Sequence, residues 1–102
     1  MKVVLVTAPA EAAENLARTL VDERLAACVA QVRGVVSTYR WNGAVERAEE
    51  TQLVAKTSDA AVAALVARVR ALHPYETPEI VVLDAVWVLP EYARWVDSAT
   101  LS

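Results

Sequence analysis

Residues 28–57 read CVAQVRGVVSTYRWNGAVERAEETQLVAKT, two strand-forming stretches that meet at the pair Asn42-Gly43. An Asn-Gly pair between two such stretches is the strongest short-range signal for a β-hairpin, because a type I′ turn needs positive φ at both central residues. The arms, Cys28–Trp41 and Ala44–Thr57, are longer than the roughly 3 to 10 residues of most strands. We therefore expect a hairpin that projects beyond its sheet or is bent by a bulge at Gly34, with edges that another chain can pair with.

A strand and a helix are predicted before the hairpin. Residues Lys2–Thr7 read KVVLVT, a β-branched run suited to a strand that is buried on both faces, and Pro9 ends it. From Ala10 to Leu25 apolar residues recur at helical spacing, with acidic residues mostly on the other side. This segment is expected to form an amphipathic helix.

A second helix, a strand and a terminal helix are predicted after the hairpin. Thr57 or Ser58 can cap a helix over Asp59–Leu72. The apolar run Glu79–Leu89 predicts a strand that is covered on both faces. Pro90 then suits the first turn of a short terminal helix.

The order strand, helix, strand, strand, helix, strand is the ferredoxin-like α+β pattern, here with a terminal helix, and it makes a single domain of residues 1–102. Right-handed crossovers would place the first and third strands in the middle of a four-stranded sheet, with both helices on one face. The other face of an apolar sheet then needs a partner, and the simplest partner is a copy of the same chain.

Composition excludes several classes of function. Hydrophobic residues make up 56% of the 102, above the roughly 45 to 50% that is usual for soluble domains. The net charge is -3, and no run of lysine or arginine stands out, so nucleic acid is not expected as a partner. The chain has no signal-peptide pattern and no apolar run long enough to span a membrane, which predicts a cytoplasmic protein. The single cysteine, Cys28, agrees with a reducing compartment.

The segment His73–Ile80, HPYETPEI, gathers the only histidine, two prolines, a tyrosine and two glutamates. Each proline fixes its own φ and keeps the preceding residue extended, so the segment should hold its side chains in a fixed geometry, as a binding site needs. The alternative is that the prolines only end a helix and begin a strand.

Metal binding and catalysis can be weighed from the same residues. His73 is the metal-ligand candidate, together with Cys28 or with carboxylates such as Glu49, Glu50 and Glu76. The spacing matches no zinc-finger or metalloprotease motif, and Cys28 in LAACVA is expected to be a small core thiol. No serine or cysteine nucleophile lies in a recognisable strained turn, so a non-enzymatic protein is predicted.

Two further features indicate binding surfaces. Lys56 ends an apolar strand just before a helix, where a lysine and a helix N-terminus can hold an anion; the alternative is a lysine whose amine reaches solvent at the rim of the sheet. Near the hairpin tip, strand alternation turns Tyr39 and Trp41 to one face and Arg40 to the other. Large aromatic residues are enriched at interface cores, which favours packing of this face against a neighbouring subunit.

Six ordered motifs resemble the CutA family of divalent-cation tolerance proteins: VTAPAE around Thr7, ERLAACV (Glu23–Val29), YRWNG (Tyr39–Gly43), the acidic pair with LVAKT (Glu49–Thr57), LHPYETPEIV (Leu72–Val81) and YARWV (Tyr92–Val96). The resemblance implies a ferredoxin-like fold, a cytoplasmic location and a homotrimer built by exchange of sheet edges through the long hairpin. It also implies an association with Cu(II) or another divalent metal and no organic cofactor. Tyr39, Trp41 and Trp95 are assigned to the trimer interface.

The same resemblance suggests two functions. The first is a trimeric, copper-binding tolerance protein. Val6 and Leu72 stand where family members have a cysteine and a second histidine, so His73 is the one of these metal ligands that this chain keeps. The alternative is a PII-like signalling module that holds a small anionic ligand in clefts between its subunits. Cleft residues would be Lys56, Tyr75, Glu76, Glu49 and Glu50, beside His73.

Overall fold

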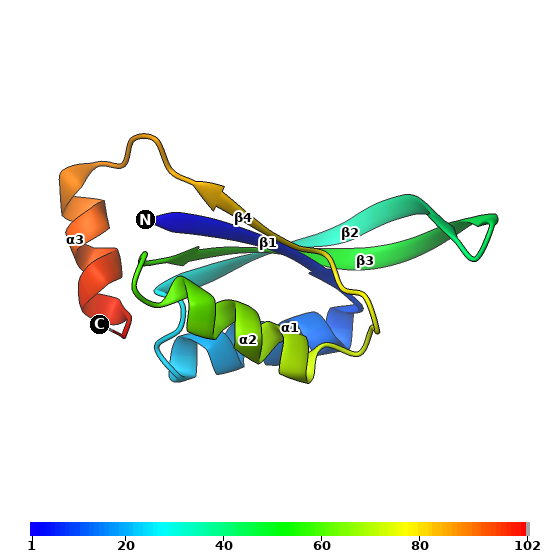
Figure 1. The fold of residues 1–102 in the computed structure, drawn as a ribbon, viewed down its shortest axis with the longest axis horizontal. Coiled ribbons are helices and arrows are strands. Elements are labelled where there is room, and N and C mark those ends of the chain that lie inside the picture. The colour runs from blue at the N-terminus through cyan, green and yellow to red at the C-terminus, as the bar shows by residue number, and fades with distance from the viewer. Residues whose placement is uncertain (102) are drawn as a thin grey trace.

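The long hairpin is the most extended feature of the computed structural model, which describes residues 1–101 (Figure 1). Strands β2 (Cys28–Trp41) and β3 (Ala44–Thr57) are antiparallel and have the predicted bounds. At the turn, Asn42 has φ 50° and Gly43 has φ 78°, the two positive values that a type I′ turn requires. Figure 1 shows the tip of the hairpin reaching well beyond the rest of the sheet.

A bulge interrupts the hairpin at the predicted place. Val32 pairs with Gln52, but Val35 pairs with Glu50, so β2 carries one extra residue here, and Gly34 has φ 71°. A shift of one residue reverses which side chains face which side of a sheet. Beyond the bulge, the odd-numbered residues of β2 therefore share a face with the even-numbered residues of β3, the face that carries Glu50.

The sheet has four strands in the order β2-β3-β1-β4, and all its pairings are antiparallel. Strands β1 (Lys2–Ala8) and β3 lie in the middle, as predicted, and β4 (Ile80–Asp84) forms an edge. Helices α1 (Ala10–Asp22) and α2 (Val62–Leu72) both cover one face of this sheet (Figure 1). The arrangement is the ferredoxin-like α+β fold.

The hydrophobic core lies between the two helices and the sheet. Alternate residues of β1 and β3 point toward the helices, and one stripe of each helix points back toward the strands. Core side chains include Val4, Val6, Leu16, Leu20, Leu53, Ala55, Leu65 and Val69. No helix among residues 1–101 combines the length and the hydropathy that a membrane span requires.

Helix α1 ends three residues before the predicted Leu25. The reason is a turn at Arg24, which has φ 61°, a left-handed conformation that stops the helix. The backbone amides of Leu25 and Ala26 both donate to the carbonyl of Leu20, at 2.9 and 3.1 Å. This turn brings the chain directly into β2.

Helix α2 begins at Val62, after a turn over residues 59–61, and not at the predicted Asp59. Ser58 caps this turn, because its Oγ accepts a hydrogen bond from the Ala61 amide at 3.2 Å. Thr57, the other predicted cap, instead donates its hydroxyl to the carbonyl of Leu25 at 2.6 Å.

The prediction of a strand through Leu89 is wrong, since β4 ends at Asp84. Within residues 1–101 it pairs with β1 alone, and this ladder ends where Asp84 pairs with Lys2. The following apolar residues are uncovered in the single chain: Val86 is fully exposed and Trp87 is 75% exposed. Helix α3 (Pro90–Ala99) then begins at Pro90, as predicted.

Candidate functional site

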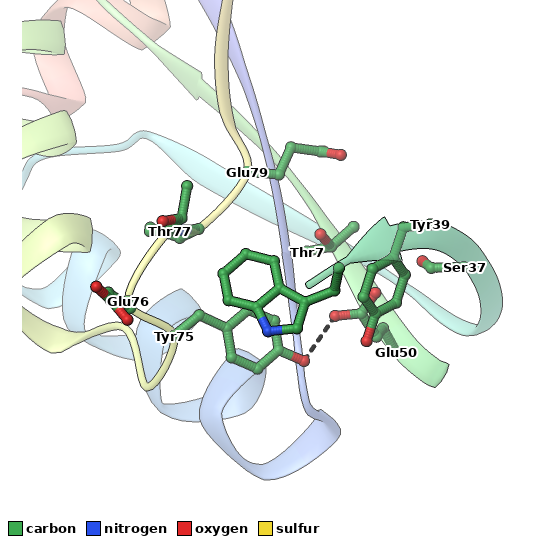
Figure 2. Close-up of a pocket in the computed structure, with 10 residues that line it drawn as sticks. Thr7, Ser37, Tyr39, Glu50, Tyr75, Glu76, Thr77 and Glu79 are labelled. Carbon is green, nitrogen blue, oxygen red and sulfur yellow. Dashed lines mark hydrogen bonds between the residues drawn. The ribbon is translucent and has the colours of Figure 1, made fainter. Parts of the chain in front are cut away.

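A pocket of about 550 Å³ lies along the hairpin, from Glu50 at its base to Trp41 beside the turn. We call it the hairpin-base pocket. It is formed by the end of β1, the part of the hairpin between the Gly34 bulge and the turn, and the segment between α2 and β4 (Figure 2). Its lining residues are Thr7, Ser37, Tyr39, Trp41, Glu50, Tyr75, Glu76, Thr77, Pro78 and Glu79. Because the Gly34 bulge puts Tyr39 and Trp41 on the face of the hairpin that carries Glu50, these residues line one side of the pocket together.

His73 fixes the segment between α2 and β4, which forms the side of the pocket opposite the hairpin. It ends α2 with an extended backbone, φ -69° and ψ 137°, as expected before Pro74. Its Nε2 lies 2.8 Å from the carbonyl oxygen of Thr7, and its Nδ1 accepts the Tyr75 amide at 3.1 Å. A carbonyl can only accept and an amide can only donate, so the ring is the neutral tautomer with the proton on Nε2. With 8% of its surface exposed, His73 acts as a buried tie between β1 and this segment.

Tyr75 and Glu50 join the two sides of the pocket. The Tyr75 hydroxyl donates to Oε2 of Glu50 at 2.7 Å, and Glu50 is only 7% exposed (Figure 2). Burial raises the pKa of Tyr75 to about 12, and the hydrogen bond and charge of Glu50 act in the same direction. Tyr75 therefore stays a phenol near neutral pH and holds the carboxylate in place.

The Tyr75 pKa predicts a loss of stability in alkali. A group whose pKa is about 12 in the folded chain and 10.0 when unfolded contributes stability below pH 10 that is lost as the pH rises toward 12. Tyr92, whose pKa is also raised to about 12, chiefly by its hydrogen bond with Cys28, adds to this loss. Tyr75→Phe should show a smaller fall in the free energy of unfolding between pH 10 and 12, measured by denaturant titration. A variant whose fall equals that of the wild type would contradict this assignment.

The pocket is acidic and aromatic. Three carboxylates line it, from Glu50, Glu76 and Glu79, and no lysine, arginine or histidine does. Tyr39 and Trp41 are each about half exposed in the single chain, so their rings form part of the pocket wall there. Such a lining favours a positively charged ligand over an anion.

The chain matches the family model described as CutA1 divalent ion tolerance protein over residues 2–99. It belongs to the CutA family. The divalent-cation tolerance protein CutA of Thermus thermophilus is 47% identical over 100 residues, which cover 97% of each chain. Among solved structures, CutA of Xylella fastidiosa has a TM-score of 0.93 at 44% identity, covering 96% of this chain and 95% of that one. The PII-like protein CutA of Nostoc sp. PCC 7120 has a TM-score of 0.95 at 39% identity, covering 99% and 98%.

Only part of the cleft predicted from the CutA resemblance comes together in one chain. Tyr75, Glu76 and Glu50 line the hairpin-base pocket, whereas Glu49 is exposed on the hairpin outside the lining. Lys56 pairs with Val3 and Cys28 at the other end of β3, about 20 Å from Glu50 at the usual rise per strand residue. A single CutA chain therefore does not place its lysine and its tyrosine around one ligand.

The three aromatic residues assigned to the interface lie in two different parts of the chain, the hairpin and α3. Tyr39 and Trp41 share one face of the hairpin, as alternation predicted, and both line the pocket. Trp95 lies on α3, about half exposed, with its ring 5.6 Å from that of Tyr92. No local pattern indicates Thr7 or Ser37 as lining residues, because their place in the pocket depends on strand register. Glu79 and Thr77 could have been inferred from their position in the stiff segment.

The residues expected to hold a metal in this CutA chain do not form a site by themselves. Both ring nitrogens of His73 are used within the chain, by Thr7 and Tyr75. Cys28 is half-buried and outside the core that was expected for it, and its Sγ lies 3.4 Å from the Tyr92 hydroxyl. In residues 1–101, no three His, Cys, Asp or Glu side chains are grouped closely enough to hold a metal ion. A copper ion at His73 would have to displace one of its hydrogen bonds.

Proposed function

We propose that this CutA family member acts in divalent-cation tolerance as a non-catalytic, cytoplasmic, homotrimeric binding protein, with the hairpin-base pocket as its ligand site. The observation that carries the proposal is the buried carboxylate of Glu50, held by Tyr75 in a pocket with aromatic walls. A buried charge costs free energy unless it is paired, and sites of this size suit small molecules. A PII-like binding role thus agrees with the geometry better than catalysis.

The open face of the sheet supports assembly. Val3 and Leu5 alternate with the core residues of β1 and so point away from the helices. Paired residues of neighbouring strands share a face, which places Leu83 beside Val3 and Val81 beside Leu5 on this open side. An apolar surface of this kind, with Val81 and Leu83 each more than 40% exposed, is typical of a protein interface.

The geometry of the edges fits a copy of the same chain. β4 is a short edge strand with unpaired backbone groups on its outer side, and the hairpin carries two edges far beyond its own sheet. Strand addition between such edges would extend the sheet into another subunit, and packing of that subunit on the open face would bury Val81 and Leu83. Light scattering should give three times the chain mass of 11.1 kDa; a monomer would refute the assembly.

Direct metal binding is the second candidate, favoured by the carboxylates of the pocket. Oxygen ligands suit divalent cations, and a second subunit could complete a site that one chain lacks. His73, the ligand predicted from the sequence, would bind only after losing a hydrogen bond. Calorimetric titration with Cu(II) separates the possibilities: loss of heat in His73→Ala supports that ligand, loss in Glu50→Gln supports the pocket, and loss in neither excludes both.

The small anionic ligand of the PII-like alternative would need a different place. Lys56 lies on the open face at the far end of β3, where only contact with another subunit could bring it near a pocket. A thermal-shift screen of nucleotides and other anions tests this: stabilisation that is lost in Lys56→Ala would support an anion site there.

A further inference from the structure

We infer that the hairpin-base pocket binds a small organic ammonium ion, held between its aromatic rings and the Glu50 carboxylate. The inference rests on the proposed function in taking this pocket as the ligand site, and it adds the chemical class of the ligand. Three observations carry it: the aromatic walls, the free oxygen of Glu50 and the absence of a metal-type cluster among residues 1–101.

The walls suit an alkylated cation. Tyr39, Trp41 and Tyr75 come from two separate parts of the chain and line the same cavity. Aromatic faces attract ammonium groups through their electron-rich rings, and aromatic cages are the usual way in which proteins recognise quaternary ammonium ions. Figure 2 shows the Tyr75 hydroxyl bonded to Glu50.

The floor of the pocket carries an incompletely paired negative charge. Oε2 of Glu50 accepts the Tyr75 hydroxyl, while Oε1 has no hydrogen-bond partner within residues 1–101. No fully buried side-chain oxygen or nitrogen in this part of the chain lacks a partner, so Oε1 is not fully buried, and Glu50 lines the pocket. A carboxylate that is 7% exposed is poorly hydrated, and a cation beside Oε1 would offset that cost.

Size and ligand geometry favour an organic ion over a bare metal. A cavity of about 550 Å³ is within the range of small-molecule sites, roughly 300 to 1,000 Å³. A divalent metal instead needs several oxygens converging at about 2.0 to 2.6 Å, and no such group forms within residues 1–101. The exposed Glu76 and Glu79 add negative charge at the rim, which attracts a cation without fixing its position.

Choline is a suitable probe, and its uncharged isostere, with a tert-butyl group in place of trimethylammonium, is the matched control ligand. Calorimetry on the full chain, in the oligomer that it forms, should show choline binding at least tenfold tighter than the isostere. Glu50→Gln and Trp41→Leu should each weaken choline at least tenfold. Glu91→Gln, which removes an exposed acid on α3, should leave the affinity unchanged. Gln can still accept the Tyr75 hydrogen bond, so the pocket of Glu50→Gln stays formed.

Each alternative result has a distinct meaning. Equal binding of choline and the isostere, or equal choline binding by wild type and Glu50→Gln, overturns the inference while leaving a ligand site in place. Cu(II) binding that depends on Glu50, without choline binding, overturns the organic ligand but keeps the pocket. Binding of neither cation overturns both the inference and the proposed ligand site.

Discussion

Replacing Leu83 with aspartate should reduce the mass in solution from three chains to one while the single chain stays folded. Leu83 is 46% exposed in one chain, where it pairs with Val3 on the face opposite α1 and α2. A carboxylate there is hydrated in the monomer, but assembly would bury it without a partner, at a cost of several kcal/mol for each subunit. Light scattering measures the mass, and far-ultraviolet circular dichroism reports the fold.

Val21→Asp is the matched control for this substitution. Val21 is exposed to a similar degree, 42%, but it lies on α1, on the opposite side of the sheet from Leu83. The Val21→Asp substitution should leave the mass of three chains unchanged. If Leu83→Asp kept the mass of three chains, the open face would not be the assembly surface.

His73→Ala should lower the free energy of unfolding by about 2 to 4 kcal/mol. The imidazole is nearly buried and bonds two backbone groups, the Thr7 carbonyl and the Tyr75 amide, which would both lose their partner. The segment that carries Tyr75 would also lose its tie to β1, so ligand affinity in the pocket should fall with stability. Denaturant unfolding at one fixed protein concentration measures the change.

Two variants control this result. Arg70→Ala, on the exposed side of α2, should change stability by less than about 0.5 kcal/mol. His73→Gln can restore one of the two hydrogen bonds and should lose less than His73→Ala. A His73→Ala variant as stable as the wild type would show that the imidazole is free of this network, and would strengthen its case as a metal ligand.

The parts of the fold that follow local rules could be predicted from the sequence. Asn42-Gly43 fixes the hairpin because few other pairs accept two positive φ values. Gly34 marks the bulge because glycine adopts the positive φ found there without steric cost. Pro74 ends α2 and Pro90 begins α3 through their fixed φ. These features depend on residues next to one another in the chain.

Two predicted elements, the last strand and the first helix, end earlier in the structure than the sequence indicated. The run Glu79–Leu89 has strand composition throughout, but β4 covers only Ile80–Asp84, because its extent is set by its ladder with the distant strand β1. Helix α1 stops at a left-handed arginine, Arg24, which sequence rules do not favour there. For β4, pairing with a distant strand outweighs local preference, whereas α1 is ended by a local turn in which the amides of Leu25 and Ala26 return to the Leu20 carbonyl.

Only the part of the candidate site that lies in one continuous segment could be predicted from the sequence. Tyr75 and Glu76 could be chosen because the prolines make their segment stiff, and both line the pocket. Their alignment with Glu50 and Tyr39 depends on strand register and on the bulge. Lys56, which the family resemblance placed with them in a cleft between subunits, lies at the other end of β3 within one chain. The acidic character of the pocket appears only when these segments are brought together.

Native mass spectrometry of the wild type and of Glu50→Gln, with choline and Cu(II) added separately, tests the central claim most directly, since it reports subunit number and bound ligand together. We expect an ion of three wild-type chains that carries up to one choline per pocket, and an ion of three Glu50→Gln chains that carries none. A single-chain ion would contradict the account. A trimer that takes up Cu(II) through His73 and no choline would contradict it too.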